Sequence, residues 1–342
     1  MNSSPPQSAE TPFLEAVDVR KSYGVHAGWT RIASITALEG VSVQAWEGKT
    51  LAIAGESGCG KSTLGRLLLG LVAPERGEIR FTGHPLGALT EIGWRNFRRS
   101  VQMVFQNTLT SFNPMLTVGG TVADAMRLRS DLISKQAKMG EAGHLLNQVG
   151  LEASLLDRYP SEVSAGQLQK ASIARALATK PRMIFLDEPT SALDASGRRQ
   201  ILDLLSRLQS ELGLGYVLVS HDFHAIGAMA HHLVVMYLGQ VVEEGPAAEV
   251  LKQPLHPYTR ALLAASALGS SRGSGWRIRG ELSQLPPGYQ GCRLYSRCPH
   301  AAPGCRELQT LVAVRPQQNV RCWRAVEIAS QSDNSERKSH QN

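Results

Sequence analysis

Apolar and polar positions alternate in two segments near the start of the chain. Leu14–Arg20 and Val41–Ala45 follow this pattern, which suits half-buried antiparallel strands. Three short apolar runs come later, at Leu51–Ala54, Met183–Leu186 and Tyr216–Val219. Continuous runs of this kind are typical of parallel strands that are buried on both faces.

Helical spacing separates these runs. Leu64, Leu67, Leu68 and Leu71 fall at i, i+3, i+4 and i+7, so they predict one apolar helix face. A helical segment over 195–212 lies between two of the apolar runs. Strand, helix and strand at this spacing predict an α/β fold with a parallel sheet and crossover helices.

Four further segments differ in composition. Residues 118–160 lack a strand pattern and are rich in Leu, Ala, Met and Lys, which favours helix, so we expect a helical subdomain over about 107–165. Residues 1–12 and 329–342 are polar and predict a disordered leader and tail. Over 256–328, Pro, Gly, Arg and Cys become frequent and periodicity fades, which predicts a small separate extension.

Composition limits the class of protein. The chain has 342 residues, of which 42% are hydrophobic, and this excludes a disordered chain. No apolar run reaches the roughly 18 residues of a membrane helix, and the N-terminus lacks the pattern of a secretory signal. We therefore expect a soluble, cytosolic protein.

Charge is concentrated at one end. The whole net charge of +7 lies in residues 256–342, which carry 12 Lys and Arg against 5 Asp and Glu. A basic patch can bind nucleic acid, acidic lipid or an acidic protein surface. A soluble arginine-rich extension without such a partner is the alternative.

A glycine-rich loop provides the first chemical motif. Residues 55–62 read GESGCGKS and fit G-x-x-x-x-G-K-[ST], between an apolar strand and an amphipathic helix, which is the context of a phosphate-binding loop. Lys61 would bridge the β- and γ-phosphates, and the Ser62 hydroxyl would ligate Mg²⁺. The residues expected to surround the phosphates are Gly55, Glu56, Ser57, Gly58, Cys59, Gly60, Lys61, Ser62 and Thr63.

Two carboxylates follow the second apolar run. Asp187 and Glu188 come at its carboxyl end, where α/β sheets bind ligands. Asp187 would hold Mg²⁺ through water, and Glu188 would polarise the attacking water. A pair of helix-capping acids is the alternative.

A third motif lies 20 residues before Asp187. Residues 163–167 read VSAGQ, and Ser164 can cap a helix whose N–H groups point at an anion. The phosphate loop lies elsewhere in the chain. This separation suggests that each ATP is clamped between two subunits.

With these motifs the sequence resembles the ATP-binding cassette (ABC) ATPases, whose signature usually reads LSGGQ. Here Ala165 replaces a glycine. The resemblance implies that Ser164, Gly166 and Gln167 of one subunit close the ATP site of the other. It implies that Tyr23 stacks on adenine and that Gln106 touches both Mg²⁺ and the membrane partner. It also implies that Asp194 is the D-loop aspartate and that His221 is the switch histidine.

A narrower resemblance rests on Ser111–Pro114, His256–Thr259 and the late cysteines. It is to the oligopeptide, dipeptide and nickel importer ATPases, in particular the second of the two ATPases that such systems usually encode. It implies a P-loop cassette over 13–255, built from a mixed, largely parallel sheet, an antiparallel β subdomain and the helical subdomain, and an extension over 256–328 that packs back on the cassette.

The resemblance also implies a function and partners. The chain would hydrolyse ATP at the cytoplasmic face of the inner membrane to drive uptake of peptides or a related solute such as nickel or a metal chelate. The partners would be a second, identical or homologous ATPase subunit, two transmembrane permeases and an extracytoplasmic solute-binding protein. An ABC ATPase acting on nucleic acid or ribosomes is the alternative from another class, although no nucleic-acid partner is expected.

Four cysteines crowd into the extension. Their spacing is not that of a C-x-x-C zinc ribbon, and arginines flank them. Related importer ATPases suggest a [4Fe–4S] cluster, which four thiolates can hold; zinc and reduced structural cysteines are the alternatives. We expect a structural rather than a redox role for Cys292, Cys298, Cys305 and Cys322.

Overall fold

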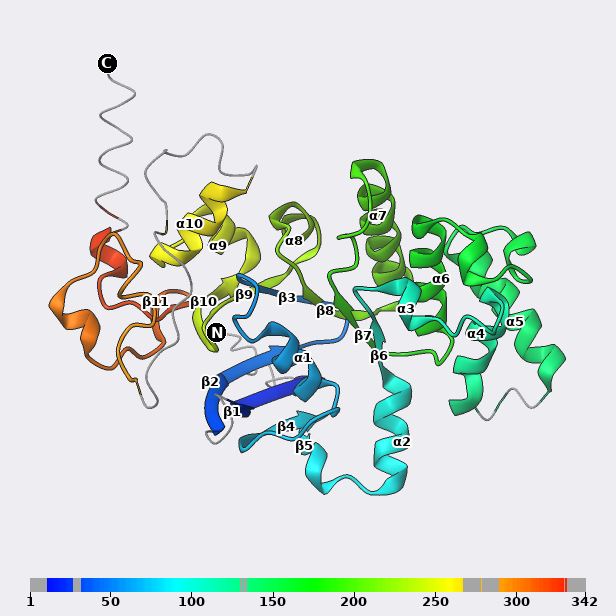
Figure 1. Ribbon diagram of the computed structural model, residues 1–342, viewed down its shortest axis with the longest axis horizontal. Helices are drawn as coiled ribbons and strands as arrows, with labels where there is room; N and C mark the ends of the chain where they lie inside the picture. Colours follow the sequence, from blue (N-terminus) through cyan, green and yellow to red (C-terminus); the bar gives the residue numbers. More distant parts are fainter. Residues whose placement is uncertain are drawn as a thin grey trace, which may run out of the picture.

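A computed structural model describes residues 11–26, 32–129, 131, 134–266, 278, 289–328 and 330. The predicted leader and tail therefore lie outside the described residues, apart from residues 11, 12 and 330. The described part forms a β-rich body with the helices of residues 108–177 at one end and the C-terminal extension at the other (Figure 1).

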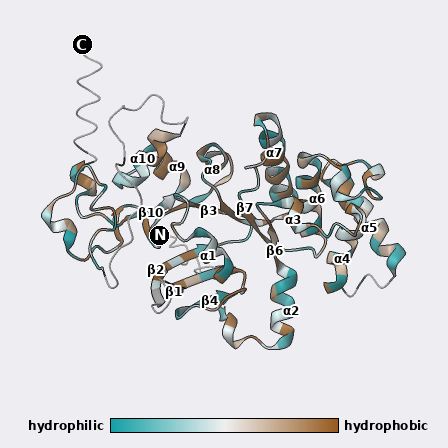
Figure 2. Ribbon diagram, viewed as in Figure 1, coloured by the Kyte–Doolittle hydropathy of each residue, from teal (hydrophilic) through white to brown (hydrophobic). Residues whose placement is uncertain are grey.

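An eight-stranded sheet forms the centre of the molecule. Its order is β11-β12-β10-β9-β3-β8-β7-β6, and the five strands from β9 to β6 run parallel. The three predicted apolar runs are confirmed as its inner strands, which Figure 2 shows as hydrophobic. The parallel strands are β3 (Thr50–Ala54), β6 (Val101–Val104), β7 (Met183–Asp187), β8 (Gly215–Val219) and β9 (His232–Tyr237).

Helices cover this sheet. α7 (Ala195–Leu212) has the predicted bounds and joins β7 to β8, and α8 (Phe223–Met229) joins β8 to β9. α1 (Lys61–Leu68) buries Leu64, Leu67 and Leu68 as predicted. The inclusion of Leu71 was wrong, because the helix ends at Leu68 and Leu71 is 65% exposed.

A second, antiparallel sheet packs beside α1. Its order is β2-β1-β4-β5, and its first two strands are longer than the alternating pattern indicates. The bounds are β1 (Leu14–His26), β2 (Ile32–Ala45), β4 (Arg76–Phe81) and β5 (His84–Pro85). The short helix η1 (Leu86–Ala88) and α2 (Glu91–Ser100) lead from it back to β6.

A helical subdomain lies between β6 and β7 as expected, but its last helix continues to Leu177, past the expected end at about residue 165. Its core forms where α4, α5 and α6 meet, around residues such as Val122, Leu146 and Ile173. Its elements are α3 (Thr108–Ser111), α4 (Val118–Ala125), η2 (Met126–Leu128), α5 (Lys135–Gln148), η3 (Ala153–Leu155), η4 (Pro160–Glu162) and α6 (Ala165–Leu177).

The extension shares a sheet with the cassette. β12 (Gln318–Val320) pairs antiparallel with β10 (Gln240–Pro246), and β11 (Val312–Arg315) pairs with β12. The composition predicts a separate unit, whereas hydrogen bonding makes these strands part of the central sheet. The remaining elements after β10 are α9 (Ala247–Lys252), α10 (Pro257–Ala265) and η6 (Pro303–Arg306).

A buried carboxylate reinforces this junction. Glu243 of β10 is fully buried and accepts hydrogen bonds from Leu255 N (2.8 Å), His256 N (2.9 Å) and Gln318 Nε2 (2.8 Å). These donors come from the segment before α10 and from β12.

Among the described residues, none of the helices has the length and apolar character needed to traverse a bilayer.

Candidate active site

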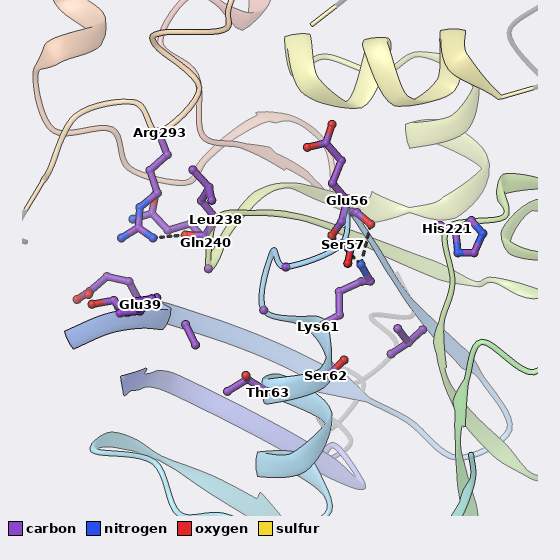
Figure 3. A pocket seen from close by; sticks show the side chains of 18 of the residues that line it. Glu39, Glu56, Ser57, Lys61, Ser62, Thr63, His221, Leu238, Gln240 and Arg293 are labelled. Atoms are coloured by element: carbon purple, nitrogen blue, oxygen red, sulfur yellow. Dashed lines mark hydrogen bonds between the residues drawn. The ribbon is translucent and has the colours of Figure 1, made fainter. Parts of the chain in front are cut away.

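A large cavity lies over the phosphate loop, at the carboxyl ends of the parallel strands. It measures about 1160 Å³, and Figure 3 shows the loop side chains around it. Every predicted phosphate-loop residue lines it except Cys59, which is 1% exposed and packs into the core. Burial raises the pKa of the Cys59 thiol against the opposing influence of Lys61, so the group stays protonated.

Glycines give the loop its curvature. Gly60 has φ 107° and Gly55 has φ 153°, values that other residues rarely adopt. A Cβ atom at Gly55 would lie 2.3 Å from Met236 O, and one at Gly60 would lie 2.5 Å from Ala37 O. The loop can therefore fold tightly over the start of α1, whose free N–H groups favour an anion.

Lys61 occupies the position that the motif predicts. Its Nζ atom donates to Gly55 O at 2.7 Å and to Glu56 O at 2.9 Å (Figure 3). The side chain is 8% exposed. The ammonium group is thus held inside the loop, where it can neutralise phosphate oxygens.

The Glu188 carboxylate contacts side chains that follow two neighbouring strands of the sheet. Its Oε2 accepts from Gln106 Nε2 at 2.9 Å, and its Oε1 lies 3.0 Å from His221 Nδ1. These three residues follow β6, β7 and β8, so the parallel sheet delivers them to one edge. Glu188 has φ 45°, an uncommon left-handed conformation that is found at functional sites.

The residues expected near Mg²⁺ also lie together. Ser62, Gln106 and Asp187 all line the cavity and offer a hydroxyl, an amide and a carboxylate, the oxygen donors that Mg²⁺ prefers. Burial and the neighbouring Glu188 raise the pKa of Asp187, while Lys61 lowers it. These groups fit Mg²⁺ bound with ATP phosphates, where the ion would neutralise charge developing on the oxygens.

Tyr23 lies beside the cavity but does not line it. Its cross-strand partner Ile35 does line it, with Ser34, Thr36 and Ala37 of the same strand. Directly paired residues point to one face of a sheet. The Tyr23 hydroxyl is buried and has no hydrogen-bond partner among the residues that the structure describes.

The residues predicted to act on a second subunit are outside this cavity. Ser164 caps α6 in a reciprocal capping box with Gln167, and Asp194 caps α7 by accepting from Gly197 N at 2.8 Å. A Cβ atom at Gly166 would meet no atom within 4 Å. Nothing in the described part of this chain thus requires a glycine there.

The four cysteines of the extension lie close enough to influence one another. Burial raises the pKa of Cys292 to about 12 and that of Cys322 to about 11, and the thiols of Cys298 and Cys305 add to both shifts. None forms a disulfide. Across the described ranges, however, no group of three or more His, Cys, Asp or Glu side chains is placed to hold a metal ion. The zinc and iron–sulfur expectations therefore find no support here.

The extension reaches the phosphate loop, which the sequence analysis did not predict. Tyr258 Oη accepts from Glu56 N at 2.7 Å, and Arg297 Nη1 donates to Glu56 Oε2 at 3.0 Å. Tyr289 and Arg293 line the cavity. The His-Pro-Tyr sequence draws attention to Tyr258, but no local pattern indicates Arg297, which lies 241 residues from Glu56.

Two family models match the chain. The one described as "ABC transporter" matches residues 38–191, and the one described as "Oligopeptide/dipeptide transporter, C-terminal region" matches residues 242–305. The second match crosses the end of the cassette and includes α10. It covers much of the chain that follows the first match, while residues 192–241 and 306–342 are matched by neither model.

Similar proteins and structures agree with these matches. The probable D,D-dipeptide transport ATP-binding protein DdpF of Escherichia coli is 41% identical, over 92% of this chain and 99% of its own. The dipeptide transport ATP-binding protein DppF of Haemophilus influenzae is 40% identical, over 87% and 92%. The dimeric structure of the bacterial ABC transporter cassette MJ0796 has a TM-score of 0.61 at 29% identity, over 68% of this chain and 98% of that one. The chain therefore belongs to the ABC transporter ATP-binding proteins of the oligopeptide and dipeptide type, and it is an ATPase.

Proposed function

We propose that this chain powers an ABC importer that takes up peptides. The observation that carries the catalytic part is the Glu188 carboxylate, held between Gln106 and His221 at the edge of the Lys61 cavity. The peptide class is supported by the dipeptide-transport relatives and by the matched C-terminal region.

In the proposed mechanism each residue has a separate task. Lys61 and the loop N–H groups bind the phosphates of ATP, and Glu188 accepts a hydrogen bond from the attacking water. Gln106 and His221 fix the direction of that carboxylate. His221 would also face the γ-phosphate, as the family resemblance implies. Catalysis then consists mainly of positioning and stabilisation of charge.

A second ATPase subunit completes each site in this proposal. Ser164 and Gly166 are at the N-terminus of α6, away from the cavity of their own chain. The open space beside Gly166 is suited to an approaching nucleotide. We expect two chains, identical or homologous, to meet head to tail with two ATP molecules between them.

The segment after Gln106 is the proposed contact with the permeases. Phe105 is 43% exposed, Leu109 57% and Met115 81%, so the segment that contains Gln106, the partner of Glu188, exposes apolar side chains. Such a surface suits a helix of a membrane partner. The complete transporter would contain two permeases and a solute-binding protein, with this chain peripheral at the cytoplasmic face.

Arginine contacts within the extension argue against nucleic acid as the partner. Arg293 donates to Leu238 O, Arg297 to Glu56, and Arg321 Nε to Val241 O at 2.8 Å. In the described part of the extension, these three arginines are thus engaged within the chain.

The deciding experiment is peptide uptake by vesicles that contain this chain with its permeases and second ATPase. We expect ATP-dependent uptake that Lys61→Ala abolishes. Salt-sensitive binding of DNA or RNA, without association with a permease, would reject the importer in favour of the alternative.

The iron–sulfur cluster remains a prediction that metal analysis decides. Four thiolates would each bind a different iron atom of such a cluster, although the described residues include no group of three or more His, Cys, Asp or Glu side chains placed to hold a metal ion. Iron and visible absorbance in an anaerobically purified sample would establish it. A colourless, metal-free sample would leave reduced structural cysteines.

A further inference from the structure

Glu56, the second residue of the phosphate loop, is bound from outside the cassette at two points. Its backbone N–H donates to Tyr258 Oη at 2.7 Å, and its carboxylate accepts from Arg297 Nη1 at 3.0 Å. Figure 3 shows the carboxylate pointing away from Lys61. Neither group is therefore turned toward the phosphates, although both belong to the loop that binds them.

The two residues that hold Glu56 are themselves firmly placed. Tyr258 is completely buried at the start of α10, and the centroids of the Tyr258 and Tyr237 rings are 4.6 Å apart. Arg297 also donates to the Tyr237 hydroxyl at 3.1 Å, and its side chain is only 10% exposed. The Glu56 side chain is 29% exposed, so the ion pair is partly buried and less screened by salt than one at the surface.

A second connection runs to the same loop. Arg293 Nη1 donates to Leu238 O, and the adjacent Gly239 N donates to Cys59 O at 2.8 Å. The extension thus touches the loop near its start directly and near its middle through the turn between β9 and β10.

We infer that Tyr258 and Arg297 of the C-terminal extension are positioning residues of the nucleotide site, which hold the phosphate loop in its ATP-binding shape through Glu56. This inference rests on the proposed function. The loop must keep several N–H groups aimed at the phosphates, and a loop with many glycines is costly to order. Fixing Glu56 beforehand reduces that cost and so increases the affinity for ATP.

The test is MgATP binding to the purified full chain, measured by equilibrium titration, together with hydrogen exchange of residues 55–61. Tyr258→Phe keeps the ring and removes only the oxygen that accepts from Glu56 N, and Arg297→Ala removes the ion pair. We expect Kd to rise about fivefold and about tenfold, respectively, with faster exchange in the loop. Arg297→Lys should recover part of the affinity.

Arg306→Ala is the matched control. Arg306 is another arginine of the extension, but its Nε atom donates to Tyr295 Oη at 3.2 Å, within the extension. We expect wild-type Kd and loop exchange from this variant. If Arg297→Ala fails to fold, Tyr258→Phe decides alone, because it changes a single oxygen.

A double-mutant cycle tests the route through Glu56. If Arg297 acts through that carboxylate, Arg297→Ala should have no further effect on Kd once Glu56→Ala is present. Wild-type Kd and exchange in Tyr258→Phe and Arg297→Ala, or fully additive effects in the cycle, would overturn the inference. Failure of the wild-type chain to bind MgATP would instead reject the proposed function.

Discussion

At the scale of single residues, the site depends on how one carboxylate is held. Each carboxylate oxygen of Glu188 has a hydrogen-bonding neighbour: Gln106 contacts one and His221 the other. Its backbone is in the left-handed region, and its N–H donates to Val219 O at 2.9 Å. The carboxylate is therefore oriented before any substrate arrives, which lowers the cost of positioning water.

Glu188→Gln should bind ATP but hydrolyse it about a hundredfold more slowly or worse, since an amide cannot accept the proton of water. The phosphate loop is untouched, so ATP should accumulate in closed dimers. Phosphate release and gel filtration with ATP measure the two effects. Normal turnover in this variant would contradict the role of Glu188 as base.

Gly166→Ala separates the requirements of the chain from those of the dimer. The added methyl meets nothing within 4 Å in its own chain, and alanine favours a helix over glycine by about 0.5–1 kcal/mol. The thermal midpoint should therefore stay or rise. ATPase activity should fall about tenfold if the methyl crowds the partner's nucleotide. If the thermal midpoint fell together with the ATPase activity, Gly166 would instead be needed for the stability of its own chain.

The sequence could predict the residues whose roles follow from local spacing. Lys61, Asp187 and Glu188 belong to motifs next to buried strands, and the parallel sheet brings such motifs to one edge. Tyr258 and Arg297 could not be predicted in the same way. Their contacts with Glu56 depend on how the extension folds back, which no periodicity in the sequence specifies.

At the scale of elements, the main finding is how the extension is attached. β12 joins the sheet through β10, and Glu243 binds the chain at Leu255 and His256, where α10 begins. The strands β3, β7 and β8 were predictable because burial on both faces leaves continuous apolar runs. β11 and β12 were not, because both strands are short and their composition is mixed.

His256 should make this attachment sensitive to acid. Burial lowers its pKa to about 3, from an ordinary value of 6.5. As the pH falls below about 6.5, His256 is therefore protonated in the unfolded chain before it is protonated in the folded one. The free energy of unfolding should then fall by up to about 1.4 kcal/mol per pH unit.

His256→Asn removes the titrating group and keeps a side chain that can cap α10. Urea unfolding of the variant should show a weaker loss of stability between about pH 7 and about pH 5 than the wild-type chain. Identical slopes would show that His256 does not control the acid response.

At the scale of the whole molecule, the ATP cavity and the α6 N-terminus are separate surfaces of one chain. Each chain can bind the phosphates of ATP with its own phosphate loop, but its Ser164 and Gly166 lie outside that cavity. Two chains related head to tail would bring each set to the other. Activity is therefore expected to belong to the pair of chains.

This arrangement predicts a steep dependence of turnover on protein concentration. The purified chain should lose specific ATPase activity on dilution, while ATP binding to the loop of each chain persists. Phosphate release over a dilution series, with nucleotide binding at the same concentrations, measures both quantities. Full specific activity under conditions where sedimentation detects only single chains would contradict a shared site.

The continuous hydrogen bonding from β6 to β11 has a mechanical consequence. Backbone ladders resist shear, so the C-terminal strands must travel as one rigid body with the ATP-binding strands during each cycle. Bending should instead be concentrated where the α4–α6 helices connect to β6 and β7. A pair of spectroscopic labels on β10 and β12 should keep a fixed separation throughout turnover, and a label on α5 should move relative to both.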